Sequence, residues 1–188
     1  MRLLKLMGAA VILFSASSAI ADPAILQIRA EYQAIRKALP TYSEESMDLA
    51  DESTEGGDAK IYRDKQKDIR LIRTNQYGEM GKTITEFYYQ NGSLIFAYRE
   101  SHQYNVPFYM IPEKAKEVGS ESFDPKKTKI VENRYYFLNG KMIRWLDEAK
   151  KQIDTRTTEF KEAETEILDF SNQLVAKTKK GRVPGACG

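Results

Sequence analysis

Two stretches of this sequence share one pattern: an aromatic run, an Asn-Gly dipeptide and an apolar run. The first is Phe87–Phe96, and the second, Tyr135–Arg144, follows it by 48 residues. Asn-Gly favours a two-residue type I′ turn, because both central residues of that turn have positive φ. Each stretch therefore predicts a β-hairpin, and together they indicate one antiparallel sheet. Two copies are too few for a solenoid, which needs at least three repeats.

A two-residue loop also predicts which side chains face each other, because side chains alternate between the faces of a strand. This rule places Arg144 opposite Tyr135 on the expected core face. There Arg144 could stack on the tyrosine ring, extend to the sheet edge or, as a third option, bind a ligand anion. The predicted pairs are Tyr89 with Leu94, Phe87 with Phe96 and Thr85 with Tyr98 in the first hairpin, and Phe137 with Met142, Tyr135 with Arg144 and Asn133 with Leu146 in the second.

The second hairpin, from Tyr135 through Asn139-Gly140 to Trp145, resembles small exported bacterial proteins of uncharacterised function. The resemblance rests on a short motif and covers about a third of the chain. It implies an exported protein that contains β-hairpins, and it implies no activity and no catalytic residue.

The first 21 residues have the order of a secretory signal peptide. Arg2 and Lys5 form a basic start, Leu6–Phe14 is an apolar run too short to span a membrane, and Ala19-Ile20-Ala21 fits a cleavage site. We therefore expect cleavage after Ala21 and a periplasmic or secreted protein. No later run approaches the about 20 apolar residues of a membrane span.

Removal of these 21 residues leaves 167 of 188, the size of one domain. The 29 basic residues include two in the signal peptide, so the remaining 27 balance the 27 acidic ones. A neutral chain gives no reason to expect a nucleic-acid partner. We expect one domain over residues 22–181 and a flexible tail over 182–188. The only cysteine, Cys187, lies in that tail and is expected to be a free thiol rather than an intermolecular disulfide.

Both ends of the exported part have helical periodicity. Asp22-Pro23 suits a helix start, and an apolar stripe then runs to Leu39, before Pro40. A second stripe begins near Asp147, continues to Leu174 and predicts a helix of about 30 residues. A C-cap at Gly181 suits its end.

We expect these two helices to pack against each other, against the sheet, or both, and we predict that they form a structural contact with each other. The alternative is that the end of the second stripe, at Phe170 and Leu174, is a docking surface for another protein. The residues expected at the contact are Ile28, Tyr32 and Ile35 on one helix and Phe160, Ile167 and Phe170 on the other.

The segment 41–60 is acidic and contains Gly56-Gly57. It does not match the calcium-loop pattern and has no histidine, so we expect a solvated connector, with a helical turn around Met47–Leu49 at most. Strand-like sequence follows at Ile61–Arg63 and Ile69–Thr74. The predicted fold is therefore α+β, with an antiparallel sheet of five or six strands between an N-terminal helix and a long C-terminal helix.

Little in the sequence indicates catalysis. His102 is the only histidine, and Ser101 beside it is not part of a G-x-S-x-G motif. The composition offers no usual zinc ligand set, and no nucleotide-binding motif is present, so we expect no cofactor, no metal and no catalytic residue. A pair of carboxylates could still hydrolyse a glycan, and Glu86 and Glu132 are the ones predicted near aromatic side chains.

Aromatic residues are abundant, with 11 Tyr, 8 Phe and 1 Trp. Most are expected to build the sheet, although such rings also form binding surfaces. The long connection 101–129 contains the apolar run Tyr104–Pro112 and is a candidate site. The candidate binding residues are Tyr98, Tyr104, Phe108, Tyr135 and Arg144.

The leading hypothesis is an exported, non-enzymatic binding protein of the bacterial envelope that interacts with a protein partner. The alternatives are a hydrolase of cell-envelope glycans that uses paired carboxylates, and a carrier that binds a small ligand on an aromatic sheet face. A shared cleft for Glu86 and Glu132 would favour the hydrolase, and a closed apolar pocket would favour the carrier.

Overall fold

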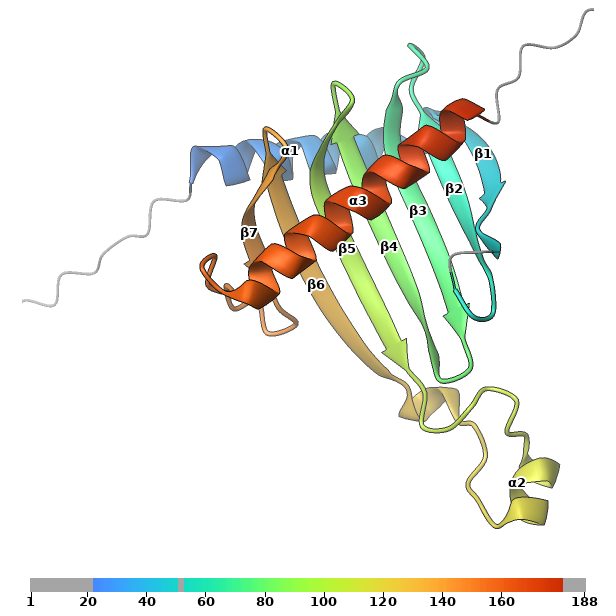
Figure 1. Ribbon diagram of the computed structural model, residues 1–188. Helices are drawn as coiled ribbons and strands as arrows, with labels where there is room; N and C mark the ends of the chain where they lie inside the picture. Colours follow the sequence, from blue (N-terminus) through green and yellow to red (C-terminus); the bar gives the residue numbers. More distant parts are fainter. Residues whose placement is uncertain (1–21, 51–52, 181–188) are drawn as a thin grey trace, which may run out of the picture.

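The computed structural model describes residues 22–50 and 53–180 (Figure 1). The predicted signal peptide and the tail that contains Cys187 lie outside these residues, as does the predicted helix end at Gly181. The fold is α+β, as predicted, with seven strands instead of five or six. Each strand pairs with its neighbours along the chain in one antiparallel sheet. The strands are β1 (Ser43–Asp48), β2 (Gly57–Arg63), β3 (Ile69–Gly78), β4 (Gly81–Gln90), β5 (Ser93–Gln103), β6 (Lys129–Leu138) and β7 (Lys141–Leu146).

The additional strand is β1, which lies in the segment predicted to be a solvated connector. It is an edge strand that pairs only with β2, from Ser43 opposite Arg63 to Asp48 opposite Asp58. Five of its six side chains are exposed and three are acidic, which discourages pairing with other chains at an open edge. The expected turn at Met47–Leu49 is instead the end of this strand, and Leu49 is buried.

Both Asn-Gly dipeptides form the predicted turns. The φ angles are 51° at Asn91 and 74° at Gly92, and 51° at Asn139 and 73° at Gly140. Positive φ at both central residues is the geometry of a type I′ turn, so these residues set the position of each hairpin loop.

A bulge next to each turn changes the rest of the pairing. The second strand contains one extra residue, Ile95 in β5 and Ile143 in β7. The pairs between the turn and the bulge are as predicted, but those beyond it are shifted by one residue. The observed pairs are Tyr89 with Leu94, Phe87 with Ala97 and Thr85 with Arg99 in the first hairpin, and Phe137 with Met142, Tyr135 with Trp145, Tyr136 with Arg144 and Arg134 with Leu146 in the second.

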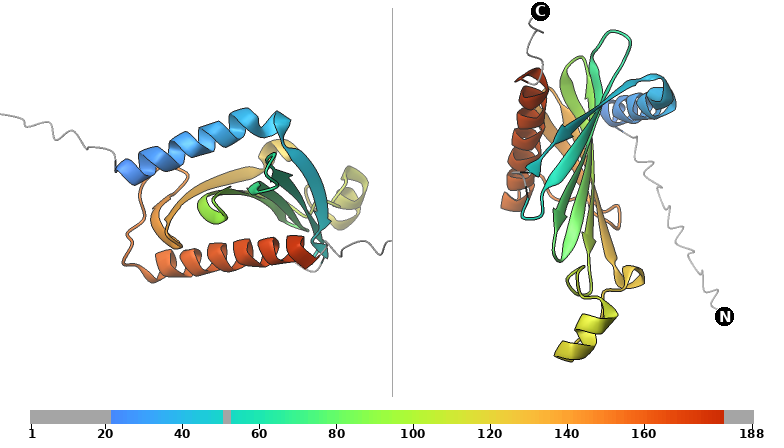
Figure 2. Two further views of the ribbon diagram at one scale, coloured as in Figure 1. Left: turned by 90° about the horizontal axis from the view of Figure 1, so that it is seen from above. Right: turned by 90° about the vertical axis from the view of Figure 1, so that its right-hand side faces the viewer.

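The two terminal helices lie on opposite faces of the sheet, so the predicted contact between them is wrong (Figure 2). Helix α1 (Pro23–Ala38) begins at Asp22, whose side chain accepts a hydrogen bond from the Ala24 N–H at 2.9 Å. A 3₁₀ turn follows over Leu39–Thr41. The buried stripe of α1 packs on β4, β5 and β6.

Helix α3 (Thr158–Lys180) covers the other face, where Phe160, Ile167 and Leu174 are buried. Phe170 packs edge-on against Phe87 of β4, with 5.8 Å between the ring centroids. The end of this stripe is therefore covered by the sheet and is not an open docking surface. Each helix buries its stripe on its own face of the sheet, which removes the need for a contact between the helices.

Helix α3 begins about ten residues later than the sequence pattern predicts. Asp147 does not cap a helix, because its carboxylate accepts the N–H of Lys151 at 2.8 Å and closes a turn in which Lys150 has a φ of 61°. The chain then follows the edge of β7, with Ile153 donating to the carbonyl of Trp145. The hydroxyl of Thr157 accepts the N–H of Phe160 at 3.2 Å at the actual start of the helix.

Candidate functional site

The candidate binding residues do not form one site. Tyr135 is 3% exposed on the α3 face, where its ring packs against Trp145 at a centroid distance of 5.4 Å. Tyr98 and Arg144 lie on the opposite face, and Tyr104 and Phe108 lie beyond the end of the sheet. The bulge at Ile143 is the reason that Arg144 faces Tyr136 and not Tyr135. Within the described residues, no hydrogen bond or salt bridge reaches the Arg144 guanidinium.

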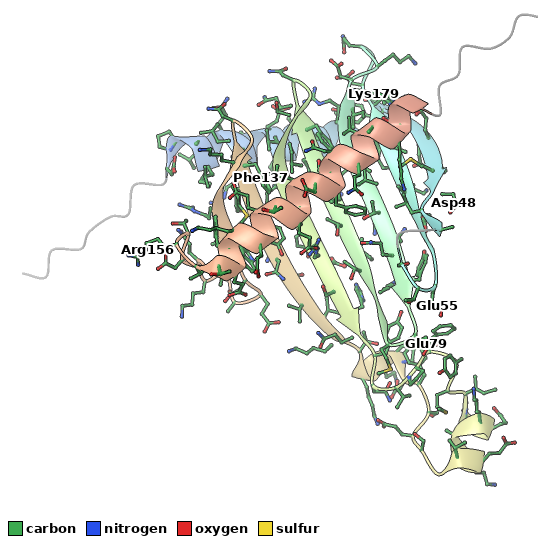
Figure 3. The ribbon with its side chains drawn as sticks, in the orientation of Figure 1. Asp48, Glu55, Glu79, Phe137, Arg156 and Lys179 are labelled. Carbon is green, nitrogen blue, oxygen red and sulfur yellow. The ribbon has the colours of Figure 1, made fainter. Side chains whose placement is uncertain are left out.

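Between β5 and β6 the chain leaves the sheet as the segment 104–128, which contains α2 (Pro112–Val118) and a 3₁₀ turn (Pro125–Lys127). This segment forms one extremity of the molecule (Figure 1). The turn between β3 and β4 anchors it, since the Tyr104 N–H donates to the carbonyl of Met80 at 2.8 Å and the Phe108 N–H donates to that of Glu79 at 3.0 Å. Glu79 is labelled at this junction in Figure 3.

Gly81 permits the close approach of strands at this junction. A Cβ atom at Gly81 would lie 2.1 Å from the carbonyl oxygen of His102, a distance that side chains do not tolerate. The end of the β3–β4 hairpin therefore requires glycine there to reach the start of the segment 104–128.

The segment is held together by its own contacts. The rings of Tyr104 and Phe123 pack at a centroid distance of 4.9 Å. Asn105 bridges its two arms, because its amide donates to the carbonyl of Ser122 at 3.0 Å and its side-chain oxygen accepts the N–H of Asp124 at 3.1 Å. The segment is consequently an ordered projection with fixed ends.

Exposed apolar side chains gather at this projection. In the described residues nine large apolar side chains are exposed, and six of them belong to the end of the β3–β4 hairpin or to the segment 104–128. We call these six the distal apolar patch. They are Tyr77, Met80, Phe108, Tyr109, Ile111 and Val118.

The patch is also chemically mixed at its aromatic centre. The rings of Phe108 and Tyr109 are 5.6 Å apart, and the Lys114 ammonium lies 4.2 Å from the centroid of Tyr109. The Tyr109 hydroxyl donates to Glu79 at 3.4 Å. The apolar run Tyr104–Pro112 is packed only in part, because Phe108 and Tyr109 face solvent.

The carboxylates suggested for glycan hydrolysis lie on the α1 face but do not form a pair. Glu86 and Tyr98 are paired across β4 and β5, and Tyr98 faces Arg134 on β6. Glu86 receives hydrogen bonds from Tyr88 at 2.5 Å and Arg36 at 3.4 Å. Glu132 instead forms a salt bridge with Arg134, so Glu86 pairs with Arg36 and Glu132 pairs with Arg134.

The carboxylate opposite Glu132 is Glu100, and the hydroxyl of Tyr98 donates to Glu100 at 3.0 Å. The Arg134 guanidinium and the Tyr98 hydroxyl lower the pKa of Glu132. Burial raises the pKa of Tyr98, and hydrogen bonds to Glu132 and Glu100 raise it further. This tyrosine therefore stays a hydrogen-bond donor between two carboxylates.

His102 is half-buried and its Nε2 lies 3.1 Å from Glu100. Ser101 precedes it in the same strand, so the two side chains point to opposite faces of the sheet and cannot form a serine–histidine pair. Within residues 22–50 and 53–180 no group of three or more His, Cys, Asp or Glu side chains is placed to hold a metal ion.

No helix in the described part of the chain is long and apolar enough to cross a membrane. Comparisons with protein-family models, curated proteins and solved structures found no match. The function must therefore be inferred from the surfaces of this chain itself. Of the distal apolar patch, Phe108 is one of the candidate residues predicted from the sequence. Met80 and Val118 carry no local signal, since only the tertiary fold brings them to the same end.

Proposed function

We propose that this protein is an exported, non-enzymatic interaction protein of the bacterial envelope, and that it binds a protein partner through the distal apolar patch. The single observation that carries the proposal is the concentration of exposed apolar side chains at the one projecting end of the fold. Large exposed apolar patches mark interaction sites, whereas exposed apolar residues are otherwise scattered singly.

The composition of the patch suits a protein partner. Phe, Tyr and Met are enriched in the cores of protein interfaces, and aromatic side chains dominate their binding energy. The segment 104–128 carries four lysines and four carboxylates. This balance gives no electrostatic attraction to an anionic lipid surface, which basic clusters provide.

The ion pairs on the α1 face support a non-enzymatic role. A glycosidase needs a general acid whose pKa is raised, and the salt bridge with Arg134 moves the pKa of Glu132 in the opposite direction. Glu86 is engaged by Tyr88 and Arg36, and strand β5 lies between it and Glu132.

Site-specific photo-crosslinking in the producing cells tests this proposal. A photoreactive phenylalanine analogue at Phe108 should give a discrete adduct with one envelope protein, identified by mass spectrometry. The matched control is the same analogue at Leu26, which is as exposed as the patch residues but lies on α1. That position should give no such adduct.

Three results would contradict the proposal. Equal adducts from both positions would mean unspecific contact, and lipid adducts from position 108 would mean that the patch contacts a membrane. A crosslinked chain that retains residues 1–21 and fractionates with the cytoplasm would exclude export.

A further inference from the structure

A half-open cavity of about 240 Å³ lies between α1 and the strands β5 and β6. None of the residues of the distal apolar patch lines it, so it is a separate site. Four of its lining side chains are apolar or aromatic and three are polar. They are Ile28, Tyr32, Phe96 and Tyr136, and Arg29, Gln33 and Arg134.

Three aromatic rings are fixed around this cavity by contacts with one another. The ring centroids of Tyr32 and Phe96 are 5.4 Å apart, and those of Phe96 and Tyr136 are 4.9 Å apart. Rings held in tilted and edge-on arrangements offer both faces and edges to a further aromatic ring. This surface therefore favours a flat, aromatic guest.

Arg134 lines the cavity, and one nitrogen of its guanidinium has no hydrogen-bond partner among the described residues. Its Nη2 donates to Glu132 at 2.5 Å, and its Cζ lies 5.2 Å from the centroid of the Tyr98 ring. Its Nη1 is buried and has no hydrogen-bond partner among the residues that the structure describes. A buried N–H without an acceptor costs free energy, and a guanidinium matches the geometry of a carboxylate. A carboxylate that pairs with this guanidinium would therefore be favoured.

A second guanidinium comes from α1. The Cζ of Arg29 lies 5.9 Å from the centroid of Tyr136, and the side chain is exposed. Within the described ranges no carboxylate forms a salt bridge with Arg29. The described residues that line the cavity include these two arginines and no carboxylate, so a guest with a negative charge is favoured.

We propose that this cavity binds a small aromatic monocarboxylate. Its ring would lie against Tyr32, Phe96 and Tyr136, and its carboxylate would pair with the guanidinium groups of Arg29 and Arg134. The volume is below the about 300–1,000 Å³ of sites that enclose drug-sized ligands, which limits the ligand to about one ring. The proposal does not depend on the proposed function, because the distal apolar patch takes no part in it.

Titration calorimetry of the purified protein with three probes tests the ligand class. Phenylacetate has both the ring and the charge, phenylacetamide has the same shape without the charge, and inorganic phosphate has charge without a ring. Phenylacetate should bind at one site, at least about tenfold more tightly than either of the others. Equal binding of phenylacetamide, tighter binding of phosphate, or no saturable binding of phenylacetate would overturn the proposal.

Substitutions then locate the site. Arg29→Gln and Arg134→Gln should each weaken phenylacetate binding at least about tenfold. Lys37→Gln removes a positive charge from the same helix outside the cavity, and it should change the affinity less than about twofold. Arg134→Gln also breaks the salt bridge with Glu132, so circular dichroism must show that this variant folds. If Arg134→Gln does not fold, the test rests on Arg29→Gln, because Arg29 is exposed. An unchanged affinity of Arg29→Gln for phenylacetate would refute the proposed site.

Discussion

Among the residues that the structure describes, the buried apolar cluster on the α3 face contains fifteen residues, whereas the cluster on the α1 face contains eight. The two helices differ in the same direction, since α3 has 23 residues and α1 has 16. The α1 face also carries charged side chains, in the Arg36–Glu86 pair between α1 and β4 and in the Arg134–Glu132 pair within β6. One sheet thus has an apolar face and a mixed face.

The apolar α3 face should contribute more to stability, whereas the mixed α1 face has the features of a binding surface. Burial of apolar area is the dominant favourable contribution to folding, so the α3 face should hold the larger share of the free energy of unfolding. The α1 face depends more on hydrogen bonds to charged groups, and it leaves a cavity between its helix and the sheet. The faces should therefore respond differently to the loss of an apolar side chain and to the loss of a hydrogen bond.

The largest expected effect comes from removing an aromatic ring on the α3 face. Phe137 is completely buried there, close to α3 in Figure 3. Phe137→Ala should lower the free energy of unfolding by about 3–5 kcal/mol, through lost burial and the cavity left behind. The preceding residue, Tyr136, lies on the α1 face beside the half-open cavity, so Tyr136→Ala should cost less, about 2–3 kcal/mol.

Chemical denaturation followed by circular dichroism measures both changes. The next residue, Leu138, is 42% exposed, and Leu138→Ala should change the free energy of unfolding by no more than about 0.5 kcal/mol. If Tyr136→Ala costs as much as Phe137→Ala, the two faces are equally packed and the comparison fails.

When a tyrosine hydroxyl is removed, the larger loss of stability should instead occur on the α1 face. Tyr88 and Tyr89 are adjacent and both buried, and they point to opposite faces. Tyr88 donates to the carboxylate of Glu86 at 2.5 Å, whereas the Tyr89 hydroxyl is bonded to the hydroxyl of Ser171 at 2.8 Å. Hydrogen bonds to charged groups contribute more than neutral ones, so Tyr88→Phe should cost about 1.5–3 kcal/mol and Tyr89→Phe about 0.5–1.5 kcal/mol.

A double substitution tests why Tyr89→Phe should lower the stability. In Tyr89→Phe with Ser171→Ala both partners are removed, so no buried hydroxyl is left unpaired and much of the lost stability should return. A larger cost for Tyr89→Phe than for Tyr88→Phe would show that the charged network on the α1 face contributes little.

The sequence predicts the parts of this fold that depend on local chemistry. Asn-Gly predicts the turns, because these two residues adopt positive φ, and Asp22 with Pro23 predicts the start of α1. The bulges could not be predicted, because Ile95 and Ile143 are apolar and fit either face. Strand β1 was missed since its polar, exposed residues show no apolar alternation.

The error about the helices has a similar cause. A helical stripe shows that a face is buried and does not identify what buries it. The consecutive buried residues Phe87, Tyr88 and Tyr89 are the signal that was available, because such a run is typical of a strand covered on both faces. Of the candidate site, Phe108 could be selected from its apolar segment, but the approach of Met80 depends on contacts between distant parts of the chain.

The smallest expected difference concerns acid pH. Arg134 and Tyr98 lower the pKa of Glu132 below its ordinary value of 4.5 in the folded protein. Well above pH 4.5, Glu132 is ionised in both the folded and the unfolded protein, and its contribution to stability is complete. As the pH falls, the unfolded chain binds the proton first, so this contribution is lost on the way to the folded pKa. The Glu132 side chain is 40% exposed, and screening should limit the effect to about 0.5 kcal/mol or less.

Denaturation at pH 7 and pH 3.5 should show a smaller loss of stability for Glu132→Gln than for the natural chain. Glu162→Gln is the control, because it removes an exposed carboxylate of α3 that forms no salt bridge within the described residues. An equal loss of stability in Glu132→Gln and the natural chain would mean that the Arg134–Glu132 pair adds nothing to the stability of the α1 face.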